Sequence, residues 1–438
     1  METSRFTTSR RGFLGLVGTG AAVAALAACS TGGGGGGGGA SASLKFWNMP
    51  WGTPAFNTLD SKITLGYKPE SGLPAATYQA IQWANFNQTF SSALASKTGP
   101  AISSGGGTQA FQFAKQGFIA PADGLIESWK SNGLYDDFLP GVLDTMKTDA
   151  GYVAVPYNLD MRVNWYNREL LEKAGATPPT DWQSYLDAAA ALKKIDVYGF
   201  AANGNASGGN AFQMIVGLMI NNGGGIFDEE HKPNLVTAAN IEALEFVREN
   251  ISKGYMDPAA ISYTATNANS QWKAEKFGMG FDVPNLAANV GGASSSQLVV
   301  GDPLTSASGK KGALYFPNNI MMYKNTPSQK GSEAFMTYYY QNMKALWTQN
   351  TGIGLPVLKS IAATPEFQSD QNAVKIVKMW QPIAKTWAAP GGTALFSNIS
   401  YVDSTPAISD FGQNVLSGKS PKDALTTFQS TLTSLIKD

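Results

Sequence analysis

The most informative segment of the sequence is GYVAVPYNLDMRVNWYNRELLEKAGATPPTDWQSYLDAAAALKK, residues 151–194. Its opening segment YVAVPY is apolar and rich in valine and tyrosine, which predicts a short strand over residues 152–157 that is cut off by Pro156. YNRELLEKAG then predicts a short helix with Gly175 as its stop. Strand and helix signals therefore follow each other closely, as they do in α/β proteins.

The same plan of strand, helix and turn recurs along the chain. Thr180 and Gln183 form a T-x-x-Q capping box for the helix DWQSYLDAAAALKK. A later helix, TAANIEALEFVRENISKG, ends at Gly254, and near the C-terminus Ser420 caps a helix that begins at Pro421. Further expected elements are strands over residues 43–49 and 75–83 and a helix in FNQTFSSALASKTG that ends at Gly99. This alternation predicts an α/β fold.

The N-terminus has the pattern of an export signal followed by an anchor. SRRGFL, residues 9–14, resembles the twin-arginine signal, and the apolar run after Arg11 is too short and too rich in Gly and Ala to span a bilayer comfortably. LAAC, residues 26–29, resembles the bacterial lipobox, in which the cysteine becomes the lipidated N-terminus. Residues 32–39 are all glycine and are typical of a flexible tether. We expect export by the twin-arginine or the Sec route, and lipid on Cys29 that anchors the protein at the outer face of the cell membrane.

The bulk composition limits the classes of partner. Cleavage before Cys29 would leave 410 of the 438 residues, which is too long for one ordinary core and predicts two lobes. The whole chain carries 32 basic and 32 acidic residues, so it has no basic field to attract nucleic acid. Aromatic residues make up 11% of the chain, and flat rings beside neutral polar groups suit a neutral polyhydroxylated ligand.

The sequence carries little catalytic equipment. His231 and Cys29 are the only histidine and cysteine, which excludes His-rich zinc sites and Cys–His dyads. His231 lies in FDEEHKP and is expected on an exposed turn, and GQNVLSGKS departs from a phosphate-binding loop at Gln413. A pair of carboxylates could still hydrolyse a glycoside, but no pair stands out. We expect a binding protein that is not an enzyme, with no cofactor and no metal.

Several motifs, in a fixed order, carry a family resemblance. Residues 151–194 combine a strand ending in PY, an acidic residue, YN, a helix, PPTDW and a second helix. The other motifs are NNGGGIFDEEH (221–231), EKFGMGFDVPN (275–285), GIGLPVLKS (352–360) and VLSGKSPKDAL (415–425). With the lipobox, the chain resembles the extracellular solute-binding lipoproteins of ABC sugar importers, the family 1 carbohydrate-binding receptors similar to maltose-binding protein. It departs from the family's pattern at Ala101, where an aspartate is usual, and at Asn285, where a tryptophan is common.

This resemblance implies a two-lobe periplasmic-binding-protein-like fold of type II, an α/β fold with mixed sheets flanked by helices and a ligand cleft between the lobes. A hinge would let both lobes close on a sugar or oligosaccharide, and the ABC permease subunits in the membrane would recognise the closed form of this monomer. The implied divisions are a signal peptide (1–28), the lipidated cysteine with its tether (29–42), an N-terminal lobe (43–160 and about 301–320) and a C-terminal lobe (about 161–300 and 321–438).

Candidate ligand-binding residues lie in loops that follow strands, where clefts of this kind hold their ligands. After the first strand come Asn48, whose amide both donates and accepts, and Trp51, whose indole can stack on a pyranose or lie in the core. In SSGGGT, Gly106 and Thr108 would bring backbone N–H groups close to a ligand or form a plain flexible turn.

Other candidates are charged or lie later in the chain. Asp160 matches the family's acidic position at the crossing between lobes, and Arg162 follows it on the same strand face. These two could bind sugar hydroxyls or form a mutual salt bridge across the hinge. Further candidates are Asn210, Phe212, Gln213, Asp282, Asn285, Asn318, Asn319 and Tyr401. Tyr401 and Trp387 could equally pack in the core, and Trp47, Trp165, Trp182 and Trp347 are expected to be structural.

Two other functions stay open on the sequence alone. The same receptor fold could bind a polyol, a peptide or a phosphorylated compound, although a phosphate would favour a basic cleft and Arg162 is the only cation among the candidates. A lipid-anchored glycan hydrolase or an adhesin is the third class. An enzyme would release products over time, whereas a receptor binds stoichiometrically and returns its ligand intact.

Overall fold

The computed structural model describes residues 42–83, 86–206, 209–392, 394–403 and 405–436. The expected signal peptide, Cys29 and most of the glycine tether therefore lie outside the described residues. The backbone of Tyr401 is described but its side chain is not.

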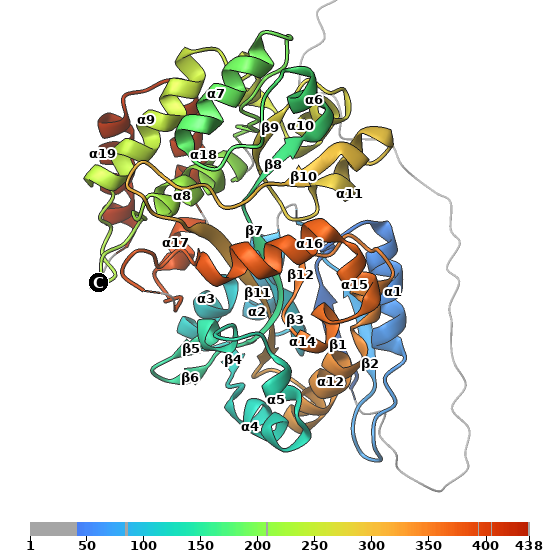
Figure 1. Ribbon diagram of the computed structural model, residues 1–438. Coiled ribbons are helices and arrows are strands. Elements are labelled where there is room, and N and C mark those ends of the chain that lie inside the picture. The colour runs from blue at the N-terminus through green and yellow to red at the C-terminus, as the bar shows by residue number, and fades with distance from the viewer. Residues whose placement is uncertain (1–41, 84–85, 207–208, 393, 404, 437–438) are drawn as a thin grey trace, which may run out of the picture. The chain divides into compact units, whose positions relative to one another are not determined.

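The larger sheet is mixed and has the strand order β12-β7-β11-β3-β1-β2, with β4 and β13 paired to β11. β1 runs parallel to β2 and β3, whereas β11 runs antiparallel to β3 and β7. This mixed sheet among helices confirms the α/β class (Figure 1). The strands are β1 Leu44–Asn48, β2 Ala76–Ala80, β3 Ile102–Gly105, β4 Ile119–Ala120, β7 Val155–Met161, β11 Ala313–Tyr323, β12 Leu355–Pro356 and β13 Ala384–Lys385.

A smaller antiparallel sheet has the order β10-β8-β9, with β8 Val163–Asn167, β9 Met279–Asp282 and β10 Leu298–Val300. Only Arg162 separates β7 from β8, so the chain passes directly from the larger sheet to the smaller one at this residue (Figure 1). It returns between β10 and β11. A separate hairpin joins β5 Lys147–Thr148 to β6 Gly151–Tyr152.

Helices pack around both sheets. The α-helices are α1 Pro54–Leu65, α2 Phe86–Ala95, α3 Gln109–Lys115, α4 Asp123–Asn132, α5 Leu134–Asp137, α6 Arg168–Lys173, α7 Trp182–Lys193, α8 Asn210–Asn221, α9 Ala238–Ser252, α10 Ala265–Lys273, α11 Leu286–Val290, α12 Gln329–Asn342, α13 Ala345–Thr348, α14 Lys359–Ala362, α15 Pro365–Ser369, α16 Gln371–Lys375, α17 Ile399–Asp403, α18 Ala407–Leu416 and α19 Pro421–Leu435. Short 3₁₀ turns span Leu143–Met146, Pro258–Ser262, Ala293–Gln297 and Gln381–Ile383, and a π-helical turn spans Ile376–Trp380.

Most helix ends follow the sequence signals, with one correction. Gly175 and Gly254 have φ of +66° and +68°, the left-handed conformation that ends a helix, and Ser420 caps α19 as expected. The N-cap of α7 is Asp181, not Thr180. The Asp181 carboxylate accepts from the backbone N–H of Ser184, and the Ser184 hydroxyl accepts from the backbone N–H of Asp181.

Two expected element boundaries in the N-terminal half are also wrong. β7 does not stop at Pro156 but continues to Met161, because Pro156 lies at a register shift in the pairing with β11, where the missing N–H breaks no regular ladder. The helix expected to end at Gly99 is α2, which ends at Ala95. The last turn closes back on itself, with the Gly99 N–H donating to the Ala93 carbonyl.

The expected lobe boundary at residue 321 is wrong as well. β11 continues to Tyr323 beside β3 and β4, which keeps the following segment against the larger sheet. α12 packs on α1 and α4, and its Phe335 ring lies 5.3 Å from the ring of Phe46 in β1. Near the C-terminus, α18 packs instead on α8 and α9, and α19 packs on α9.

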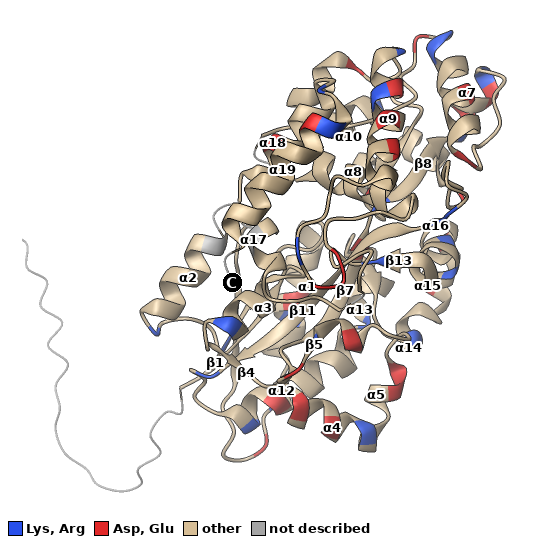
Figure 2. Ribbon diagram, turned by 90° about the vertical axis from the view of Figure 1, so that its left-hand side faces the viewer, with Lys and Arg blue, Asp and Glu red and all other residues tan. Residues whose placement is uncertain are grey.

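Charged side chains of both signs are interspersed on the outer helices, among them α4, α7 and α9 (Figure 2). His231 is exposed with φ of +61°, which confirms the expected turn. The four tryptophans expected to be structural are all buried: Trp47, Trp165, Trp182 and Trp347.

Candidate ligand-binding cleft

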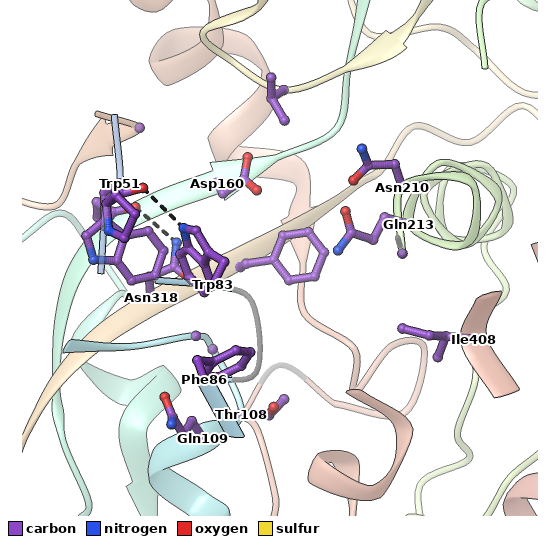
Figure 3. Close-up of a pocket in the computed structure, with 18 of the residues that line it drawn as sticks. Trp51, Trp83, Phe86, Thr108, Gln109, Asp160, Asn210, Gln213, Asn318 and Ile408 are labelled. Carbon is purple, nitrogen blue, oxygen red and sulfur yellow. Dashed lines mark hydrogen bonds between the residues drawn. The ribbon is translucent and has the colours of Figure 1, made fainter. Parts of the chain in front are cut away.

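A cleft of about 580 Å³ lies between segments that are far apart in sequence. One side carries the loops after β1 and β2, the start of α3 and the strands β7 and β11; the other carries the start of α8 and the loop after β9. Figure 3 shows Asn210 and Gln213 projecting from α8 toward Asp160 and the aromatic side chains. The volume falls within the range of ~300–1,000 Å³ that is usual for small-molecule sites.

The floor of the cleft is built by paired residues of β7 and β11. In the antiparallel register Asp160 lies opposite Phe316, and Asn158 lies opposite Asn318. Since alternate residues of a strand share a face, all four side chains point to the same side of the sheet. The Asn318 amide donates to Asn158 Oδ1 at 3.0 Å, which fixes the orientation of both amides.

Three aromatic rings form one wall. The indole of Trp51 meets that of Trp83 edge to face, with ring centroids 4.7 Å apart and planes at 86°, and Phe86 lies 5.5 Å from Trp83. Trp51 Nε1 donates to Asn48 Oδ1 at 3.0 Å, and Trp83 Nε1 donates to the Pro50 carbonyl at 3.1 Å. Both polar edges are therefore satisfied within the protein, and the 39% exposure of Trp83 leaves apolar ring surface free at the cleft.

The start of α3 brings an unpartnered amide to the cleft. Gln109 lines the cleft, is only 3% exposed, and neither its Oε1 nor its Nε2 has a hydrogen-bond partner among the described residues. Gly105 makes room for it, because a Cβ there would lie 2.8 Å from Gln109 Oε1. Asn158 Nδ2 is likewise buried and unpartnered. Because buried amides rarely stay unsatisfied, these covered atoms require a polar partner, such as a water or a ligand group.

Arg162 organises the side of the cleft next to α8. Its guanidinium donates to Asp160 Oδ1 at 2.8 Å and from Nε to Gln213 Oε1 at 3.1 Å, and it lies 5.3 Å from the centre of the Phe316 ring. Arg162 itself is only 6% exposed and does not line the cleft. Arg162 therefore contacts three lining side chains, those of Asp160, Gln213 and Phe316, on the side away from the cleft. Since the Gln213 oxygen is taken, that amide presents its NH₂ group to the cleft.

The lining of the cleft is almost free of charge. Asp160 is the only charged residue among the described residues that line it, and Arg162 neutralises that carboxylate from behind. Asp282 lies near Arg162 outside the cleft, and burial raises the pKa of its carboxyl group. The surface that a ligand meets is thus a set of amides, hydroxyls and rings around one carboxylate.

The structure brings eight predicted residues to the cleft: Trp51, Gly106, Thr108, Asp160, Asn210, Gln213, Asn285 and Asn318. Asn285, at the position where the resembled family commonly has tryptophan, donates to the Gly352 carbonyl at 2.7 Å and so joins the two sides at one end. The alternative salt bridge between Asp160 and Arg162 is also present, so Asp160 serves both as a partner of Arg162 and as a lining residue.

Five predicted residues lie away from the lining. Phe212 is buried in the core, stacked on Trp387 at 5.0 Å between ring centres. Asn319 is buried and donates to the Gly106 carbonyl at 3.2 Å, which supports the glycine loop. Asn48, Arg162 and Asp282 lie behind the lining. The side chain of Tyr401 lies outside the described part of the chain.

Sequence inspection missed several lining residues, and a signal existed for some. Trp83 and Phe86 follow β2 as Trp51 follows β1, but the expected strand ran to Trp83 and hid the loop. Asn158 lies two residues before Asp160, on the same face of β7. Gln109 gave no such signal, since its place at the cleft depends on how α3 meets β11.

No group of three or more His, Cys, Asp or Glu side chains within the described ranges could hold a metal ion. No helix in this part of the chain combines the length and the hydropathy needed to cross a membrane.

Comparison with known proteins places this geometry in a family. A sugar transporter from Arthrobacter chlorophenolicus, solved with bound laminaribiose, is 49% identical with a TM-score of 0.85, over 91% of this chain and 100% of that one. An ABC transporter solute-binding protein from Thermotoga lettingae, solved with α-D-tagatose, is 17% identical with a TM-score of 0.72 over 90% and 99% of the two chains, and shares the fold. A binding protein of Brucella abortus is 24% identical over 74% of this chain and 81% of its own length. The pattern of the bacterial extracellular solute-binding proteins matches residues 74–345, and the chain belongs to this family.

Proposed function

We propose that this protein is the receptor of an ABC importer that binds a neutral sugar or oligosaccharide in the cleft and delivers it to the membrane permease. The observation that carries the proposal is the lining of the cleft, in which indoles and neutral amides surround a single carboxylate. The similarity to the laminaribiose-bound Arthrobacter protein supports it and makes a glucose disaccharide the first ligand to test.

Each part of the lining suits a sugar. The free face of Trp83, at the corner formed with Trp51, can stack on the apolar face of a pyranose ring. Asp160 can accept hydrogen bonds from two neighbouring hydroxyls. Gln109, with donor and acceptor both unpartnered, matches a hydroxyl group that donates and accepts at once.

A phosphorylated ligand fits less well. No Lys or Arg is among the described residues that line the cleft, and the nearest guanidinium, Arg162, already bonds to Asp160 and Gln213. A phosphate would therefore meet the Asp160 carboxylate without a free cation to balance it. A neutral polyol shares the hydroxyl chemistry of a sugar but offers no ring face to the indoles.

Delivery follows from contacts on both sides of the cleft. A ligand that touches Asn210 or Gln213 on α8 and Trp83 on the opposite wall stabilises the arrangement in which the two sides are close. Ligand binding therefore shifts the population toward that arrangement. The permease would recognise it and take up the ligand unaltered.

The proposal includes a lipid anchor on Cys29. It is supported by the sequence LAAC at residues 26–29 and by the glycine tract that follows, which would separate the folded part from the membrane. The twin-arginine-like SRRGFL segment supports export in the folded state. The mass of the N-terminal peptide of the mature protein tests the anchor directly.

A thermal-shift panel on the chain without its signal peptide tests the ligand class. Laminaribiose, other neutral saccharides, mannitol and glucose 6-phosphate would be compared at equal concentration. A ligand at 100 times its dissociation constant adds about 2.7 kcal/mol to the free energy of unfolding, so a bound saccharide should raise Tm by several degrees. A rise with mannitol alone would favour a polyol receptor, and a rise with glucose 6-phosphate alone would contradict the neutral-ligand proposal.

A further inference from the structure

A carboxylate is buried behind the aromatic wall without a cation. Asp60, in the middle of α1, is fully buried, and none of the ion pairs found among the described residues includes it. Its oxygens accept instead from Asn48 Nδ2, at 2.7 Å, and from the hydroxyl of Tyr339. Burying a carboxylate without a paired cation costs free energy. The side chains that donate hydrogen bonds to Asp60 therefore indicate which part of the protein it affects.

One of these partners connects Asp60 to the cleft. Asn48 donates its NH₂ group to Asp60 and accepts, at Oδ1, the indole N–H of Trp51 at 3.0 Å. Ser104 Oγ shares that N–H at 3.1 Å. Trp51 in turn forms the edge-to-face corner with Trp83. An unbroken chain of contacts therefore runs from Asp60 to the ring surface at the cleft.

The two ends of the Asn48 amide are not equivalent. A carboxylate only accepts hydrogen bonds, so it selects the NH₂ end of the amide and leaves the oxygen for Trp51. A reversed amide would turn its NH₂ group toward the indole N–H, and two donors would face each other. We propose that Asp60 is a positioning residue: as a carboxylate it fixes the orientation of Asn48, and through it the Trp51 indole, so that ligand affinity depends on the ionisation of Asp60. The inference rests on the proposed function, in that Trp51 contacts ligand.

The surroundings of Asp60 make this ionisation sensitive to pH. Burial raises its pKa from 3.8 to about 6, and the hydrogen bonds from Tyr339 and Asn48 only partly offset that rise. The titratable groups that face it are Tyr78 on β2, Tyr339 on α12 and, beyond Tyr339, Tyr157 on β7. The pKa of each tyrosine is raised by burial, so all three stay neutral between pH 5 and 8.5.

Above about pH 6 Asp60 is ionised and only accepts hydrogen bonds, which holds Asn48 in one orientation; below it, the protonated carboxyl keeps an acceptor oxygen but gains a donor, so it selects the NH₂ end less strongly. Affinity should therefore fall as the pH falls through 6. Because Ser104 still accepts from Trp51, the loss should be partial, about fivefold between pH 7.5 and pH 5, which is the usual worth of one hydrogen bond.

The test is calorimetric affinity for laminaribiose between pH 5 and 8.5 with matched variants. Asp60→Asn should bind about fivefold more weakly than wild type at pH 7.5 and show no dependence on pH. Tyr339→Phe removes a hydrogen bond that lowers the pKa of Asp60 but keeps the link to Asn48. It should bind like wild type at pH 8.5 while the midpoint of its profile moves upward. His231→Gln, which alters the only histidine, and Asp282→Asn should leave the midpoint unchanged.

A spectroscopic measurement covers the case in which Asp60→Asn fails to fold. The indole N–H resonance of Trp51 in the ligand-free protein, assigned by its loss in Trp51→Phe, should shift with a midpoint near pH 6. A resonance that does not titrate overturns the inference, as does an affinity that is flat with pH in wild type and unchanged in Asp60→Asn. Absence of saccharide binding at every pH would instead refute the proposed function, and the N–H titration would still test the link from Asp60 to Trp51.

Discussion

A single guanidinium decides which atoms the cleft presents beside α8. Arg162 takes Gln213 Oε1 and one oxygen of Asp160, so this side offers a donor next to an acceptor. The sequence identified Asp160, Arg162 and Gln213 as candidates but could not distinguish the residues that face the cleft from the one that holds them. That distinction depends on the position of α8 relative to β7, which no local pattern encodes.

Gln213→Glu tests this arrangement. Both oxygens of a glutamate at position 213 would accept from Arg162, and the donor toward the cleft would be lost. We expect saccharide affinity to fall about tenfold, since one hydrogen bond is lost and a second negative charge is placed near Asp160. Calorimetry on the folded variant measures the change.

The control for charge is Gln112→Glu, which adds the same charge to the lining from α3, away from Arg162. A similar loss in both variants would mean that added charge alone, and not the donor of Gln213, explains the effect.

The residues around Asp60 also show that the sequence does not distinguish side chains that face the cleft from side chains behind it. Asn48 was expected to touch ligand because it follows the first strand, yet its amide is buried between Asp60 and Trp51. The spacing of the sequence identifies the segment that reaches the cleft. It does not tell which side chain of the segment faces outward, since that depends on the long-range partners of each one.

At the scale of elements, sequence signals gave most helix ends and failed where two signals overlap. TDWQS contains both T-x-x-Q and D-x-x-S, and both predict a cap. The structure selects the second, with Trp182 buried and stacked on Phe246 directly after the cap. The first residue of the helix that the Asp181 cap begins, Trp182, thus makes this tertiary contact.

Removing the cap that the structure uses should cost stability. Asp181→Ala leaves the first turn of α7 without its side-chain acceptor and should lower the free energy of unfolding by about 1 kcal/mol, measured by urea titration. Thr180→Ala should change it by a few tenths at most, because no cap bond to α7 comes from the Thr180 side chain. The reverse ranking would contradict the assigned cap.

Two strand ends were also predicted at the wrong residues. The prediction that Pro156 ends the strand placed the end of β7 before Asp160. A register shift in the pairing with β11 allows proline within the strand. Running β2 on to Trp83 concealed an aromatic residue that lies on the wall of the cleft. Both errors concern irregular pairing, which depends on the neighbouring strand.

At the scale of the whole molecule, the motifs of residues 151–194 predicted the architecture well. They include the crossing at Arg162, where the chain leaves the larger sheet for the smaller one. The chain crosses a second time between β10 and β11. What failed was the boundary at residue 321, because the return of α12 to the larger sheet follows from the length of β11 and its pairing with β3 and β4.

Binding of an intact sugar in the cleft between these parts can be tested by a single calorimetric experiment. Laminaribiose is titrated into the purified chain, and the ligand is then released by denaturation and analysed by chromatography. We expect saturable heat with one ligand per chain and recovery of the intact disaccharide. Absence of heat across laminaribiose and the other neutral saccharides, or conversion of the disaccharide to glucose, would contradict it.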